Sequence, residues 1–191
     1  MSLDSRWLAG EFDGVVLAKH GGEAPAVRLQ LFGDLGPKML DLLARPDRLT
    51  GYFPQGREGI DCSMPREAAP HPLIFMGASL LEQFSDRPAS RVVGVREEPE
   101  GWWMRLKPVI PGMGVDAFRD RSGRVTKRRL SWMYGVGWVE EWPTPDEVRI
   151  SASGVAIRVR ILERSPNVVL KPGALELTLP PDVRVVQGTR P

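Results

Sequence analysis

The chain has 191 residues and a net charge of only +2, from 26 Lys and Arg against 24 Asp and Glu. This length suits a single domain over residues 1–191, with a core large enough to be stable without a disulfide or a metal. The small positive surplus argues against nucleic acid as a partner. The single cysteine, Cys62, excludes an intramolecular disulfide.

Most of the first half of the chain alternates between apolar and polar residues, which is typical of β-strands with one buried face. The expected strands are Gly14–Lys19, Val27–Leu31, Lys38–Ala44 and Arg48–Phe53. An irregular loop is expected from Gln55 to His71. The apolar residues of the next segment are spaced as on a helix, so a short amphipathic helix is expected over Pro72–Phe84.

Alternation returns after the helix. The expected strands there are Arg91–Glu97, Trp102–Lys107, Val115–Arg119, Val125–Met133, Gly137–Trp142, Glu147–Ala152, Val155–Ile161 and Leu175–Leu179. Turn sequences such as Pro99-Glu100-Gly101 leave only short connections, and short connections join antiparallel neighbours. The chain is therefore expected to be mainly β and antiparallel, as a sandwich, barrel or part-barrel.

Residue patterns typical of an active site or a metal centre are not found. His20 and His71 lie in loop-like sequence and are not spaced as metal ligands, and no serine lies in a nucleophile elbow. The acidic pairs Glu97-Glu98 and Glu140-Glu141 are interpreted as surface charge, because neighbours on a strand point to opposite faces. We expect a non-catalytic protein that needs no cofactor.

Two clusters suggest binding surfaces. The basic run contains Arg119, Arg121, Arg124, Lys127, Arg128 and Arg129. It is either a patch for anionic lipid headgroups or an acidic partner, or a solvated hairpin; on a strand, Arg128 would share a face with Leu130 and Trp132 rather than with its neighbours. Trp102 and Trp103 should face opposite sides of one strand, so the sheet is covered on both sides, or one face lines a cavity, or one indole is half-exposed at an edge.

Several sequence segments resemble those of the outer-membrane lipoprotein carrier and receptor proteins, the LolA-like and LolB-like family. They are the opening segment Trp7–Phe12, the segment Leu31–Gly36 followed by Met39–Leu42, the aromatic strand Trp138–Pro143, the segment Ile161–Asn167, and the closing run Leu175–Val183. The helix follows the early strands at the place where the family has a lid. The chain departs from the family in having no cysteine near its start for lipid attachment.

The resemblance implies an unclosed half β-barrel of about ten or eleven strands with a short helical lid over its concave face. Its groove would hold acyl chains of lipoproteins or other lipids, in transport to the outer membrane. It further implies a location in the periplasm or at the periplasmic face of the outer membrane, with a targeting segment outside this chain.

The expected groove lining comes from one face of the strands and from the apolar face of the helix. The candidates are Leu29, Leu31, Leu40, Leu42, Trp102, Met104, Leu130 and Trp132 from strands, with Leu73, Met76, Leu80 and Phe84 from the lid. Three alternatives stay open: a β-sandwich-like domain of the cell envelope with a filled core that docks another protein, a closed lipocalin-like barrel, and an enzyme with an unfamiliar site.

Overall fold

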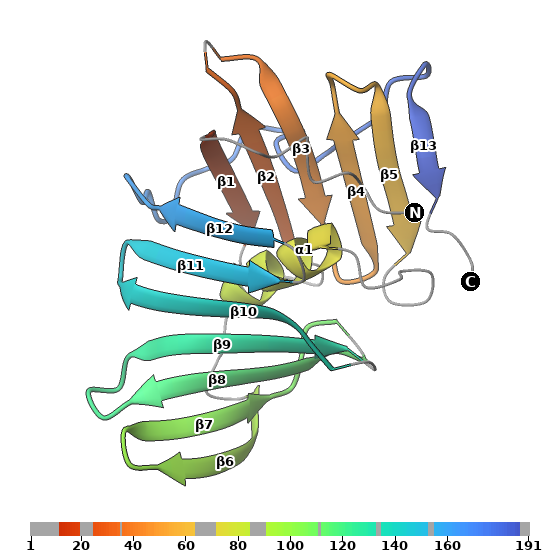
Figure 1. Ribbon diagram of the computed structural model, residues 1–191. Coiled ribbons are helices and arrows are strands. Elements are labelled where there is room, and N and C mark those ends of the chain that lie inside the picture. Colours follow the sequence, from red (N-terminus) through yellow and green to blue (C-terminus); the bar gives the residue numbers. More distant parts are fainter. Residues whose placement is uncertain are drawn as a thin grey trace.

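The computed structural model describes residues 12–19, 25–34, 36–63, 72–84, 91–110, 112–132, 135–152 and 155–187. Over these residues the protein is mainly β, with thirteen strands in two sheets and one helix. The sheets do not close into a barrel, and their strands run in different directions on either side of the helix (Figure 1). The expectation of a mainly β, largely antiparallel fold is confirmed, and the described residues form more than the ten or eleven strands expected. The expected opening strand Trp7–Phe12 lies, apart from its last residue, outside the described residues.

The first sheet has the order β1-β2-β3-β4-β5-β13. Its strands are β1 (Asp13–Lys19), β2 (Ala26–Phe32), β3 (Lys38–Ala44), β4 (Arg48–Phe53), β5 (Glu58–Ser63) and β13 (Arg184–Gln187). Neighbours from β1 to β5 are antiparallel, and β13 pairs with β5 in parallel. The four strands predicted in this half are confirmed.

The second sheet has the order β12-β11-β10-β9-β8-β7-β6 and is antiparallel throughout. Its strands are β6 (Val92–Glu98), β7 (Gly101–Leu106), β8 (Gly114–Asp120), β9 (Val125–Trp132), β10 (Gly135–Thr144), β11 (Glu147–Ala152) and β12 (Val155–Arg160). Short turns join β6 to β7, β8 to β9 and β10 to β11, as the turn sequences predicted, whereas seven residues separate β7 from β8. All seven strands predicted for this region are confirmed, with ends that differ by one or two residues.

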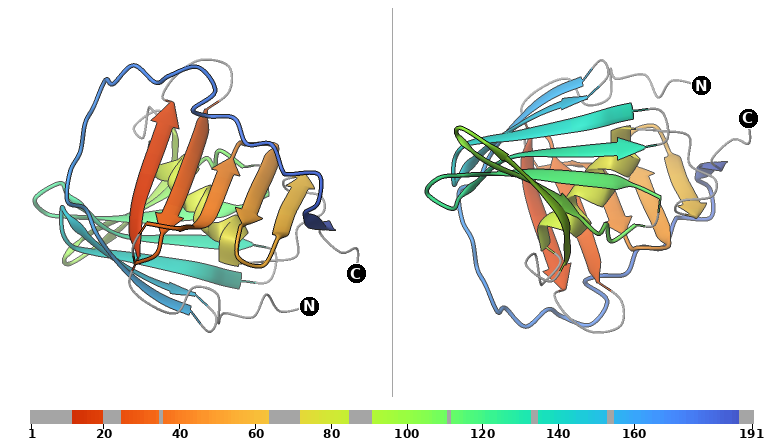
Figure 2. Two further views of the ribbon diagram at one scale, coloured as in Figure 1. Left: turned by 90° about the horizontal axis from the view of Figure 1, so that it is seen from above. Right: turned by 90° about the horizontal axis from the view of Figure 1, so that it is seen from below.

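Helix α1 spans Pro72–Phe84, the range expected from the helical spacing. It lies between the two sheets and contacts β2 and β3 of the first and β10 of the second (Figures 1 and 2). Two glycines permit this close packing. A methyl group at Gly77 would lie 2.8 Å from Leu49, and one at Gly137 would lie 2.3 Å from the ring of Phe75.

Two expectations about the chain in and around the first sheet are wrong. The predicted loop Gln55–His71 contains strand β5, which the short and irregular apolar pattern of its sequence did not indicate. The predicted strand Leu175–Leu179 forms no ladder. Its leucines are partly buried and its polar residues exposed, so the alternation reflects an extended chain packed on one side.

The segment from Ile161 to Val183 crosses the outer face of the first sheet and leads into β13 (Figure 2). Two arginines of the sheet hold its backbone. Arg28 Nη1 donates to the carbonyl of Ala174 at 2.9 Å, and Arg45 Nη2 donates to the carbonyl of Leu175 at 3.1 Å. Because the segment lies over a face rather than beside an edge, side chains and not a ladder satisfy these carbonyls.

Asp41 is buried on this outer face and accepts hydrogen bonds from three side chains. Arg28 donates to both carboxylate oxygens at 2.7 and 2.8 Å, and Lys38 and Gln30 donate at 2.6 and 3.0 Å. Burial alone would raise the pKa of Asp41, but these donors outweigh it and hold the pKa below its ordinary value of 3.8. The ionised carboxylate therefore stabilises the folded state.

We expect Asp41→Asn to lower the free energy of unfolding by roughly 1–3 kcal/mol at neutral pH. Because the pKa of Asp41 is lower in the folded than in the unfolded chain, the unfolded chain binds a proton more readily. The stabilisation by the Asp41 carboxylate is therefore present above about pH 4 and is lost as the pH falls through the folded pKa. Urea unfolding between pH 7 and pH 2 should show the two proteins converging in acid. Asp34→Asn, at an exposed turn residue, is the control; a gap that does not depend on pH would contradict the assignment.

Candidate functional site

The predicted groove residues fall into two groups. Nine of the twelve belong to one apolar cluster between the sheets, around α1. They are Leu29, Leu31, Leu40 and Leu42 from β2 and β3, Leu130 and Trp132 from β9, and Leu73, Met76 and Leu80 from α1. Leu40, Leu130 and Leu73 are almost fully buried. The sequence therefore identified residues that lie close together in the structure, where they pack in one cluster.

Trp102 and Met104 form the second group, outside this cluster. Together with Leu106, which packs against the cluster, they occupy every second position of β7, so all three side chains share the inner face of the second sheet. Val95 of β6 lies directly opposite Met104 and is 63% exposed. We call Val95, Trp102, Met104 and Leu106 the apolar strip. At one end of the strip Leu106 packs against the core, and at the other Val95 is exposed on β6. Strands β6 and β7 form one end of the second sheet (Figure 1).

The remaining candidate, Phe84, ends α1, and its side chain lies outside the described residues. Its predicted contribution to the groove stays a prediction. His20 and His71, which were expected in loops and not as metal ligands, also lie outside the described residues.

The adjacent tryptophans of β7 lie on opposite faces, as their position on a strand predicted. Trp102 is covered on the inner side by the guanidinium of Arg121, 4.5 Å from the ring centroid. Trp103 packs on the outer side against Phe118, with the ring centroids 5.3 Å apart, and under Arg129 at 4.1 Å. Both indoles are partly buried, and each is covered by an arginine, so a guanidinium lies on both faces of β7 at this position.

A buried polar cluster joins α1 to the second sheet. Glu140 accepts hydrogen bonds from Arg128 at 2.7 and 2.9 Å and from the indole nitrogen of Trp138 at 2.7 Å. The Ser79 hydroxyl of α1 also donates to Glu140, and Arg128 donates to the Ser79 carbonyl at 3.0 Å. Glu140 is 1% exposed. The expectation that Glu140 is surface charge is wrong, because its strand face turns toward α1.

A second carboxylate fixes the later part of α1. Glu82 accepts from Arg91 Nη2 and from the backbone nitrogen of Val109, both at 2.5 Å. Arg91 also donates through Nε to the carbonyl of Lys107 at 2.7 Å. These contacts connect α1 to the segments that precede β6 and follow β7. The helix is therefore held by two buried carboxylate sites as well as by apolar packing.

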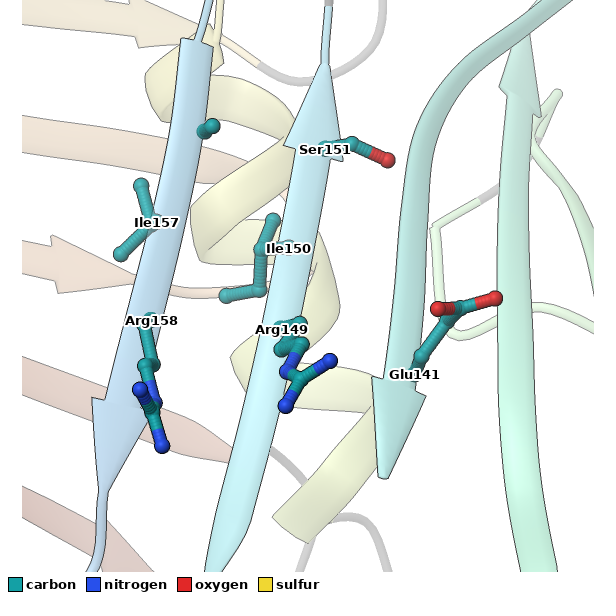
Figure 3. Close-up of a pocket in the computed structure, with 7 residues that line it drawn as sticks. Glu141, Arg149, Ile150, Ser151, Ile157 and Arg158 are labelled. Atoms are coloured by element: carbon teal, nitrogen blue, oxygen red, sulfur yellow. The ribbon is translucent and has the colours of Figure 1, made fainter. Parts of the chain in front are cut away.

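The outer face of the second sheet carries paired charge. Lys127 bonds Glu141 and Arg105 bonds Asp116 across neighbouring strands. A surface hollow of about 350 Å³ lies on this face over β10–β12 (Figure 3), lined by Glu141, Arg149, Ile150, Ser151, Ala156, Ile157 and Arg158. None of the predicted groove residues lines it. Both of its arginines bond Glu147, at 3.0 and 2.9 Å, so their charge is already neutralised.

The basic run is divided between the two faces, as the strand alternation predicted. Arg128 is buried on the inner side beside Leu130, whereas Lys127 and Arg129 lie on the outer side. Within the described ranges, no group of three or more His, Cys, Asp or Glu residues is placed to hold a metal ion. Cys62 is buried in the apolar cluster.

Comparison with protein-family models finds no match to this chain, and comparison with curated proteins finds none either. In the part of the chain that the structure describes, no helix is long and apolar enough to cross a membrane. The candidate function therefore rests on the apolar strip and on the residues around it.

Proposed function

We propose that the protein binds an acyl chain of a lipid on the apolar strip, without catalysis. The observation that carries the proposal is the open end of the strip: Val95 is largely exposed and lies opposite Met104, which shares the inner face of β7 with Leu106, and Leu106 packs against the buried core. Exposed apolar side chains that extend a core along one concave face are typical of a ligand surface.

The energetics are compatible with a weak and chemically unspecific site. Each methylene group removed from water contributes about 0.8 kcal/mol, so about six methylenes on the strip contribute roughly 5 kcal/mol before the entropic cost of binding. Apolar contact of this kind needs no single essential polar residue, so a binding site of this kind leaves no sharp motif in the sequence.

The resemblance to the LolA-like and LolB-like proteins extends this proposal. On that basis the two sheets correspond to an unclosed half-barrel, α1 to its lid, and the bound chains to those of lipoproteins in transport to the outer membrane. The proposed location is the periplasm or the periplasmic face of that membrane, and a second envelope protein would be a partner in transfer.

We expect Val95→Asp to weaken binding of a neutral apolar probe, N-phenyl-1-naphthylamine, at least about tenfold, because the probe would have to displace water from a carboxylate. Fluorescence titration measures the effect. Val169→Asp is the matched control: it makes the same change at a valine that is 91% exposed in the segment between β12 and β13. Equal affinities of the two variants, at unchanged urea midpoints, would remove the strip from the proposal.

A protein-interaction domain is the second candidate, and the filling of the space between the sheets by α1 favours it. Ala78 and Leu81 of α1 are fully buried. A domain of this kind would bind no probe in the wild-type protein, and native mass spectrometry of material purified from cells would show only the mass of the chain.

A further inference from the structure

The cross-strand row next to Val95 and Met104 contains a positive charge, Arg119, beside Trp102. Trp102 lies directly opposite Arg119 of β8 in the ladder. Val115, Ala117 and Arg119 occupy every second position of β8, and Val115 and Ala117 are buried on the inner face. The side chain of Arg119 therefore lies on the inner face too, which is the face of the apolar strip.

Arg119 differs from the other arginines around the strip. Arg121 covers Trp102, donates to the carbonyls of Glu98 and Pro99 at 3.0 and 3.2 Å, and pairs with Glu97 at 3.0 Å. Arg119 is exposed, and within the described residues it forms no ion pair. Its guanidinium is therefore available to an anionic ligand.

We propose that the ligand of the apolar strip is a fatty acid whose carboxylate binds Arg119. This inference rests on the proposed function, because the chain of the fatty acid occupies the strip. A guanidinium matches a carboxylate in charge and in planar, two-point hydrogen bonding. At its open end the strip consists of Val95 alone on β6, which suits a single acyl chain. The carboxylate of Glu97 lies opposite Trp102, in the same cross-strand row as Arg119, and disfavours a doubly charged headgroup.

The test compares three ligands of equal chain length by isothermal titration calorimetry of the wild-type protein, with the two anions below their critical micelle concentrations and the alcohol below its solubility limit. They are dodecanoate, the neutral 1-dodecanol, and dodecyl phosphate. We expect dodecanoate to bind about tenfold more tightly than 1-dodecanol, as expected for one charge-assisted contact. In Arg119→Gln this difference should disappear while the affinity for 1-dodecanol stays unchanged.

Arg105→Gln is the matched control. Arg105 belongs to the neighbouring strand β7 but lies on the outer face, where it bonds Asp116 at 3.0 Å. Its loss removes the same charge from the protein, so a difference that survives in Arg105→Gln and disappears in Arg119→Gln assigns the contact to Arg119.

The outcomes separate this inference from the proposal beneath it. Equal binding of dodecanoate and 1-dodecanol by the wild-type protein would overturn the carboxylate contact and leave acyl-chain binding intact. Tighter binding of dodecyl phosphate than of dodecanoate would overturn the choice of a fatty acid. If none of the three ligands binds, the proposed function itself fails.

Discussion

Glu140→Gln is expected to lower the free energy of unfolding by about 3–5 kcal/mol, because it leaves Arg128 buried without a counter-charge. Arg128 and Glu140 have side chains only 7% and 1% exposed, and their closest atoms lie 2.7 Å apart. The substitution also weakens the contacts that Ser79 and Trp138 make with the carboxylate. Urea unfolding followed by tryptophan fluorescence measures the change.

Glu141→Gln is the natural control for this experiment. Glu141 is the next residue on β10, points to the opposite face, and pairs with Lys127 while half-exposed. Its substitution should cost no more than about 1 kcal/mol. The double variant Arg128→Met, Glu140→Leu should recover much of the lost stability, because it removes both charges together. A small effect of Glu140→Gln alone would mean that the pair is solvated.

Leu81→Ala is expected to cost about 2–5 kcal/mol, the range found when a fully buried leucine is truncated and its neighbours close the cavity only in part. Leu81 is fully buried in the cluster that α1 forms with both sheets. The variant should unfold in one transition at a lower urea concentration. Leu162→Ala, at a leucine that is 84% exposed, should have no measurable effect.

The way in which Leu81→Ala unfolds also tests the role of α1. A loss of global stability means that the helix is part of the common core. If the midpoint stays unchanged while amide exchange in residues 72–84 becomes faster, the helix separates from the sheets by itself, as a movable lid would.

The sequence predicted most strands and the helix because their local periods are strong. Glu147–Ala152 alternates at period two, and Pro72–Phe84 carries apolar residues at helical spacing. The strand β5 was missed because its pairing depends on β4 and on the distant β13. The segment Leu175–Leu179 was assigned as a strand because one-sided burial and ladder formation give the same alternation.

The candidate site was predicted in part for a similar reason. Alternation placed Trp102 and Met104 on one face of β7, and nine other candidates in one cluster. It did not reveal which residues the helix would cover and which would stay open. Glu140 was misassigned because a charged residue on a strand is usually solvated. Two features of the sequence indicated a buried pair. Glu140 lies two residues after Trp138 and Arg128 lies two residues before Leu130, so each charged residue shares a strand face with a large apolar one.

The central claim, that an acyl chain lies on the apolar strip, is tested most directly by photolabelling with a fatty acid that carries a diazirine in its chain, followed by peptide mass spectrometry. We predict that the label attaches mainly to residues 92–106, in β6 and β7, and that unlabelled dodecanoate prevents this. Labelling confined to the hollow over β10–β12, or labelling that dodecanoate does not reduce, would contradict the claim.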